Sequence, residues 1–204
     1  MIGGQAEIVK TTISVSFKRG ETIYRAGDQS NSLYIIHKGK VKIYRLAESG
    51  KEQLIRILEP GEFTGELALF TESTHDNYAE AMEHTEICML NASDLLQFLS
   101  KYPSISLKIL KEFSHRLDRA EVQATSFATE DVEKRIALYL AELTDESRSM
   151  IVQLPMSRKD LASFLGTTPE TISRKLTSFE ESGWIVQQGQ RDIHILDLDA
   201  LLLI

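Results

Sequence analysis

From Val15 to about Leu90 the chain runs in short β-branched and aromatic segments that alternate with turn-forming residues. The turns are Lys18–Gly20, Gly27–Asp28, Lys38–Lys40, Ser49–Gly50 and Pro60–Gly61. Many short strands separated in this way predict an antiparallel β-sandwich or a barrel-like roll.

The clearest strand of this region covers residues 40–46, where apolar and polar side chains partly alternate. Because successive side chains of a strand point to opposite faces, we expect Val41, Ile43 and Arg45 to share one face. Residues 42, 44 and 46 then lie on the other face.

After Asn91 the hydrophobic period changes to that of a helix. A short helix is expected to end before Pro103, and a longer one follows it. Along the longer helix, apolar residues recur at alternating spacings of three and four: Leu110, Phe113, Leu117, Ala120, Ala124 and Phe127. This a/d pattern is typical of a seam between two helices and predicts a dimer interface. The alternative is that the stripe packs on the chain's own core.

The segment 156–176 has the pattern of two short helices joined by a tight turn. Ser157 is a suitable N-cap, with Asp160 three residues later, and Gly166 is suited to the left-handed conformation that ends a helix. Thr168 caps the second helix, and Pro169 occupies its first position, where the missing N–H costs nothing. The pattern predicts a helix-turn-helix.

The first two turns of the second helix carry Glu170, Ser173 and Arg174, which point away from its apolar face. A recognition helix presents side chains to the major groove at this place. Arginine can bind guanine with two hydrogen bonds, glutamate can accept from cytosine N4, and serine can do either. The candidate DNA-binding residues are Arg158, Thr168, Glu170, Thr171, Ser173 and Arg174.

After Gly183, the segments 184–186 and 192–195 flank the polar stretch 187–191, which predicts a hairpin wing beside the helix pair. The expected fold class is therefore α+β. It comprises a β-roll sensor domain in residues 1–103, a dimerisation helix in 104–128 and a winged helix-turn-helix in 129–204.

Composition adds limits to this picture. The chain has 204 residues, 42% hydrophobic and 26% charged, as in an ordinary globular protein. Neither a stretch of about 20 apolar residues nor a signal-peptide pattern at the start is present, so we expect a cytoplasmic protein without a membrane partner. The net charge is −7, and residues 151–204 hold 5 basic and 7 acidic side chains. DNA binding must therefore depend on a local surface.

Catalytic and metal chemistry find no support in the sequence. Cys88 is the single cysteine, which excludes an intrachain disulfide and a four-cysteine site. The five histidines show no paired ligand spacing, so we expect no metal and no cofactor. No nucleophile is placed beside a base, and we expect the protein not to be an enzyme.

With these features, the chain resembles the cyclic-AMP receptor / fumarate-nitrate regulator family of bacterial transcription regulators over nearly its whole length. The segment 170–174 is similar to the recognition helix of the fumarate-nitrate branch. The segments 27–28, 33–36, 38–39, 60–63 and 65–70 are similar to the family's cyclic-nucleotide-type roll. The segment before Phe17 is shorter than in most members.

The resemblance implies an effector pocket in the roll. Its candidate residues are Gly65, Glu66, Leu67, Asp76, Asn77, Ala120 and Glu121. Members that bind cyclic AMP carry Arg-Ser where this chain has Asp76 and Asn77. In a dry pocket, two like charges about 4 Å apart repel by roughly 4 kcal/mol at an effective dielectric constant near 20. Cyclic AMP is therefore not expected to be the effector.

The resemblance also implies the partners. These are double-stranded DNA bound as an inverted repeat resembling TTGAT…ATCAA, a second copy of the chain, a small-molecule effector that the sequence does not identify, and RNA polymerase if the protein activates transcription. The alternative is a ligand-binding roll that acts as a regulatory or adaptor module on a protein partner. That alternative gives no reason for the arrangement of Glu170, Ser173 and Arg174.

Overall fold

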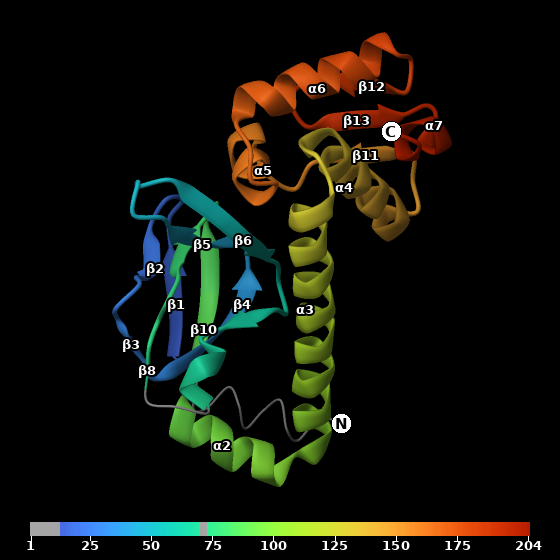
Figure 1. Ribbon diagram of the computed structural model, residues 1–204. Coiled ribbons are helices and arrows are strands. Elements are labelled where there is room, and N and C mark those ends of the chain that lie inside the picture. The colour runs from blue at the N-terminus through green and yellow to red at the C-terminus, as the bar shows by residue number, and fades with distance from the viewer. Residues whose placement is uncertain (1–12, 70–72) are drawn as a thin grey trace. The chain divides into compact units, whose positions relative to one another are not determined.

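The computed structural model describes residues 13–69 and 73–204 (Figure 1). Residues 1–12, for which no signal peptide is expected, lie outside the described residues. Phe70, the last residue of the segment 65–70 that resembles the family's roll, also lies outside them. The chain divides into two compact units, Met1–His115 and Arg116–Ile204. Within the described residues, no helix is both long enough and apolar enough to cross a membrane.

The first unit is built around antiparallel strands, as the turn spacing predicts. Its strands are β1 (Ile13–Phe17), β2 (Thr22–Tyr24), β3 (Gln29–Ser30), β4 (Ser32–Lys38), β5 (Val41–Leu46), β6 (Glu52–Leu58), β7 (Phe63–Thr64), β8 (Ser73–Thr74), β9 (Tyr78–Ala81) and β10 (Thr85–Asn91). They form a sheet of order β1-β10-β4-β7, a sheet of order β2-β9-β5-β6 and the pair β3-β8.

Strand β5 pairs with β9 in an unbroken register from Val41 to Tyr44. Val41 and Ile43 are buried in one apolar cluster, whereas the Lys42 ammonium lies 4.7 Å from the centroid of the Tyr44 ring. The register between β5 and β6 shifts between Ile43 and Tyr44, which is a β-bulge. Because Ile43 pairs with Arg56 and Tyr44 with Leu54, the extra residue, Ile55, lies in β6 and not in β5.

Two apolar layers hold the first unit together. The inner layer, between the two larger sheets, includes Tyr34, Ile36, Val41, Ile43 and Ile87. The outer layer lies on the opposite face of β4 and β10 and is formed by Leu33, Phe63, Leu90 and Leu95, with partly buried residues such as Ile109 and Phe113 against it. Successive side chains of β4 therefore point alternately into the inner layer and into the outer layer.

Helices cover the outer layer. The short 3-10 helix η1 (Glu66–Leu69) follows β7, and α2 (Ala92–Lys101) follows β10. The Asn91 side chain caps α2 by accepting from the backbone N–H of Ser93 at 3.0 Å. Helix α3 (Pro103–Thr129) begins in the first unit and continues into the second.

The second unit contains the remaining elements. They are α4 (Val132–Ser147), β11 (Ile151–Gln153), α5 (Arg158–Phe164), α6 (Pro169–Glu181), β12 (Ile185–Gln188), β13 (Asp192–Ile195) and α7 (Leu198–Leu202). The strands form a sheet of order β11-β13-β12. The helices pack around fully buried side chains of α4, α5 and α6, including Ile136, Leu140, Leu161, Ile172 and Phe179.

Candidate DNA-binding site

The two helices of the predicted helix-turn-helix begin and end where the sequence indicates. The Ser157 hydroxyl accepts from the backbone N–H of Asp160 at 3.1 Å, and the Thr168 hydroxyl accepts from that of Thr171 at 3.3 Å. Gly166 has φ +67°, and the N–H of Thr167 closes the end of α5 on the carbonyl of Ala162 at 2.8 Å. The caps thus set the turn between α5 and α6.

Helix α6 is fixed by its apolar face. Ile172, Leu176 and Phe179 are fully buried, and the Lys175 ammonium forms an ion pair with Glu133 of α4. Burial of these three side chains leaves the opposite face of α6 free for recognition.

That opposite face carries the predicted Glu170 and Arg174. Both are exposed, and Arg174 has no hydrogen-bond or ion-pair partner among the described residues. The backbone N–H of Glu170 itself, followed by the Thr168 hydroxyl, lowers the pKa of the Glu170 carboxyl. Glu170 is therefore an ionised acceptor at neutral pH, and Arg174 is an unpaired donor that can form two hydrogen bonds.

Ser173 and Arg158 are engaged with each other. The Arg158 guanidinium donates to the Ser173 hydroxyl at 3.4 Å and to the Gln187 side-chain oxygen at 2.8 Å. Gln187 in turn donates to Glu180 through its backbone N–H at 2.8 Å and through its side-chain amide at 2.9 Å. These bonds to Gln187 lower the pKa of the Glu180 carboxyl.

This chain of contacts joins α5, α6 and the wing, and it was not predicted from the sequence. Gln187 was assigned only to the wing loop, and Glu180 was not singled out. Their contacts span up to 29 residues of sequence, so no local pattern marks them. The wing itself is confirmed as an antiparallel hairpin of β12 and β13, with a third strand, β11, that was not expected.

Of the other predicted DNA-binding residues, Thr168 and Thr171 interact at the start of α6. Their hydroxyl oxygens lie 3.2 Å apart. The Thr168 hydroxyl also caps the helix by accepting from the backbone N–H of Thr171, and its hydrogen bond to the Glu170 carboxyl engages it further.

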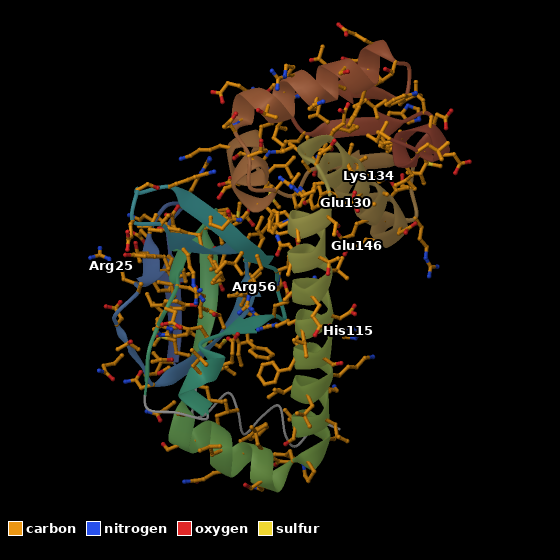
Figure 2. All side chains as sticks on the ribbon, viewed as in Figure 1. Arg25, Arg56, His115, Glu130, Lys134 and Glu146 are labelled. Atoms are coloured by element: carbon orange, nitrogen blue, oxygen red, sulfur yellow. The ribbon has the colours of Figure 1, made fainter. Side chains whose placement is uncertain are left out.

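The predicted effector residues of the first unit occupy different environments. Gly65 is buried with φ +84°, and a Cβ there would lie 2.3 Å from the Ser32 carbonyl oxygen. Glu66 forms an ion pair at 2.8 Å with Arg56, which Figure 2 labels, and Leu67 is exposed. Only glycine fits at position 65, and the Glu66 carboxylate neutralises the Arg56 cation.

Asp76 and Asn77 lie at the surface and interact with Arg45 of β5. The Asp76 carboxylate is 3.6 Å from the Arg45 guanidinium, and the Asn77 side-chain oxygen accepts from Arg45 Nε at 2.8 Å. The Asp76 side chain is 65% exposed. The repulsion of roughly 4 kcal/mol expected in a dry pocket does not apply to a screened, paired carboxylate, so this expectation is wrong.

The inside of the roll contains an aromatic stack. The Tyr24 and His75 rings are parallel within 10° with centroids 3.8 Å apart, and the Tyr24 hydroxyl lies 2.6 Å from that of Thr64. Burial raises the pKa of Tyr24 to about 12. Burial also lowers the pKa of His75, so both rings are neutral packing groups at neutral pH. Neither was singled out as a pocket residue from the sequence, because the fold alone brings them together.

The long helix α3 exposes most of its predicted stripe. Leu110 and Leu117 are 60% and 61% exposed, and Ala120, Glu121 and Ala124 are exposed too. Phe113 instead packs against the outer layer, and the centroids of the Phe113 and Phe63 rings are 6.0 Å apart. Phe127 lies under the Arg135 guanidinium at 5.2 Å.

A β-roll followed by a helix-turn-helix with a wing defines a class of ligand-regulated DNA-binding proteins, and sequence comparisons agree with this class. The cyclic nucleotide-binding domain matches residues 14–102, and the Crp-like helix-turn-helix domain matches residues 134–204.

Relatives match over most of their length. The chain is 34% identical to the "Probable transcriptional regulator flp" of Lacticaseibacillus casei, covering 88% of this chain and 82% of the relative. It is 30% identical to the "CRP-like cAMP-activated global transcriptional regulator" of Mycobacterium tuberculosis, covering 96% and 89%. Among solved structures, FixK2 from Bradyrhizobium japonicum is 26% identical with a TM-score of 0.79, covering 93% of this chain and 95% of that one.

The chain belongs to the cyclic-AMP receptor / fumarate-nitrate regulator family. It is a DNA-binding transcription regulator of that type, and its relatives are regulators rather than enzymes.

Proposed function

We propose that two copies of this chain bind a two-fold symmetric DNA site resembling TTGAT…ATCAA, with one α6 in the major groove of each half-site. The observation that carries the proposal is the free, exposed Arg174 on α6, one turn after the ionised Glu170. The "Anaerobic regulatory protein" of Haemophilus influenzae is 31% identical, covering 91% of this chain and 73% of the relative, which supports a regulatory role.

Arg174 is assigned to the guanine of each half-site, because its unpaired guanidinium matches guanine O6 and N7. Replacement of Arg174 by Ala is expected to lower the affinity for the inverted repeat by roughly 1–3 kcal/mol. Replacement of the guanine in the DNA should weaken the wild-type protein but should not weaken Arg174→Ala further. Fluorescence anisotropy with both proteins and both DNAs measures this coupling.

The control is Lys51→Ala, which removes an exposed cation from a turn of the first unit and should leave the affinity unchanged. If Arg174→Ala loses the same free energy on random DNA as on the inverted repeat, Arg174 contacts phosphate and the assignment fails.

We also propose that cyclic AMP does not control this protein. The family's phosphate-binding Arg-Ser is replaced here by Asp76 and Asn77, which are occupied with Arg45. The nearby Arg56 is already neutralised by Glu66. A cyclic phosphate therefore has no unpaired arginine to meet at these positions, although a relative at 30% identity is named as cAMP-activated.

Isothermal titration of the full chain with cyclic AMP tests this second proposal. We expect no saturable heat at micromolar concentrations. Asp76→Arg should introduce binding, because it restores the cation, and Asp76→Asn should not. Saturable micromolar binding to the wild-type chain contradicts the proposal.

A further inference from the structure

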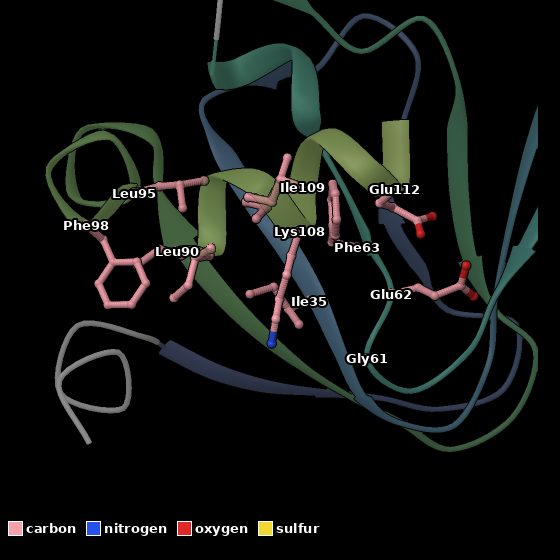
Figure 3. A pocket seen from close by; sticks show the side chains of 12 residues that line it. Ile35, Gly61, Glu62, Phe63, Leu90, Leu95, Phe98, Lys108, Ile109 and Glu112 are labelled. Carbon is pink, nitrogen blue, oxygen red and sulfur yellow. The ribbon is translucent and has the colours of Figure 1, made fainter. Parts of the chain in front are cut away.

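A cavity of about 290 Å³ lies in the outer layer of the first unit, and Figure 3 shows the side chains that line it. Leu33 and Ile35 of β4 line it, whereas Tyr34 and Ile36, which alternate with them, belong to the inner layer. The opposite walls come from α2 and from the first half of α3. This cavity is therefore distinct from the region of Gly65, Asp76 and the Tyr24–His75 stack.

Its walls are mainly apolar, with Leu33, Phe63, Leu90, Leu95, Phe98 and Ile109 among the lining residues. An apolar cavity of about 150 Å³ stays dry and can bind benzene. A cavity of about twice that volume is suited to an apolar group of about ten carbon atoms, and it lies at the lower end of the range of small-molecule sites.

The polar side chains at the rim of the cavity differ in charge and in whether they already have a partner. Lys108 is the only cation among the lining residues and has no ion-pair partner among those described. The Glu62 carboxylate is engaged, because it accepts from the backbone N–H of Glu59 at 2.7 Å. Glu112 is not free either. The group that remains available at the rim is therefore a donor with a positive charge.

We propose that this cavity binds a medium-sized apolar monocarboxylate, with the hydrocarbon among the leucine and phenylalanine side chains and the carboxylate at Lys108. A charge-assisted hydrogen bond to a carboxylate suits a single ammonium group. The ligand also contacts Ile105, Lys108, Ile109 and Glu112, which lie on one face of α3. Occupancy therefore acts on the same helix that carries the proposed dimer seam.

Calorimetric titration of the full chain with decanoate tests the site, with decanol as the uncharged probe. We expect saturable binding of decanoate, weakened about tenfold in Lys108→Met because a hydrogen bond to a charged group is lost. Decanol binding should be the same in both proteins. The matched control is Lys111→Met, which removes an exposed cation of α3 that does not line the cavity.

A second variant, Ile35→Phe, adds volume inside the cavity and should weaken decanoate and decanol together. Because overpacking can also destabilise a core, the urea midpoint of this variant is measured first, and the Lys108→Met comparison holds even if Ile35→Phe does not fold. The absence of saturable decanoate binding to the wild-type chain, equal binding by Lys108→Met, or tighter binding of decylamine than of decanoate overturns the proposal.

The link to α3 rests on the proposed function, but the binding site does not. Titration without DNA reports on the cavity alone, whereas anisotropy with the inverted repeat reports on DNA binding. Failure of one therefore leaves the other standing.

Discussion

His75 is a buried titratable side chain with an unusual environment. It is 5% exposed, stacks on Tyr24, and its buried Nε2 has no hydrogen-bond partner among the described residues. Burial lowers its pKa below the ordinary value of about 6.5, although Asp28 and Glu66 oppose this shift. Folding therefore favours the neutral imidazole.

The sign of the pH effect follows from this direction. Between the lowered folded pKa and the unfolded value near 6.5, the unfolded chain binds more protons, so stability falls as the pH drops below about 6.5. Urea midpoints of the wild type and His75→Phe, compared at pH 8 and pH 5.5, measure this contribution.

We expect His75→Phe to lose less stability on acidification than the wild type, because phenylalanine keeps the stacking surface without a proton to bind. His37→Gln, at an exposed position, is the control and should follow the wild type. An identical pH dependence in His75→Phe and the wild type contradicts this account.

At the residue scale, sequence reasoning succeeds where a local rule decides the position of a side chain. Glu170 and Arg174 are exposed on α6 because the caps and the buried face of a single helix determine this. The Arg158–Gln187–Glu180 contacts and the Asp76–Arg45 pair join distant segments. Neither could be read from one sequence, since only the tertiary fold brings those residues together.

At the element scale, helices with strong caps were predicted more accurately than strands. Ser157, Gly166 and Thr168 mark the ends of α5 and α6 closely, because each satisfies backbone groups of its own helix. The bulge at Ile55 in β6 and the short strand β11 depend on pairing with other strands. Apolar and polar alternation carries no information about such register shifts.

Helix α3 supplies the prediction at this scale. Leu110, Leu117 and Ala124 are exposed and lie seven residues apart, so they form a stripe that a second copy of the helix can cover. Leu107 and Val122 are exposed as well and were not part of the expected seam. Phe113 packs on the chain's own core. The alternative interpretation, in which the whole stripe packs on that core, therefore holds for this residue but not for the exposed ones.

Leu117→Asp is expected to give monomers, because two facing carboxylates cannot be buried in an apolar seam without a large desolvation cost. Analytical ultracentrifugation at micromolar concentration measures the change. Leu138→Asp, at an exposed leucine of α4, is the matched control and should remain dimeric. A Leu117→Asp protein that sediments as a dimer places the interface elsewhere.

At the scale of the whole molecule, the order of a β-roll, a long helix and a winged helix-turn-helix was predictable from the change in hydrophobic period and from the turn residues. The net charge of −7 did not indicate DNA binding. A negative net charge is compatible with DNA binding, since Arg174 is exposed and unpaired on α6 while Lys175 is neutralised by Glu133. In the proposed binding mode, DNA recognition depends on a few placed cations rather than on overall charge.

The central claim is that two copies of the chain recognise one symmetric site. The most direct measurement compares the affinity of the full chain for the inverted repeat TTGAT…ATCAA with its affinity for the same half-sites separated by about five further base pairs, which is half a helical turn. The account predicts that the longer spacing binds no better than a single half-site, because the second α6 then faces the wrong side of the DNA. Equal affinity for the two spacings would contradict it.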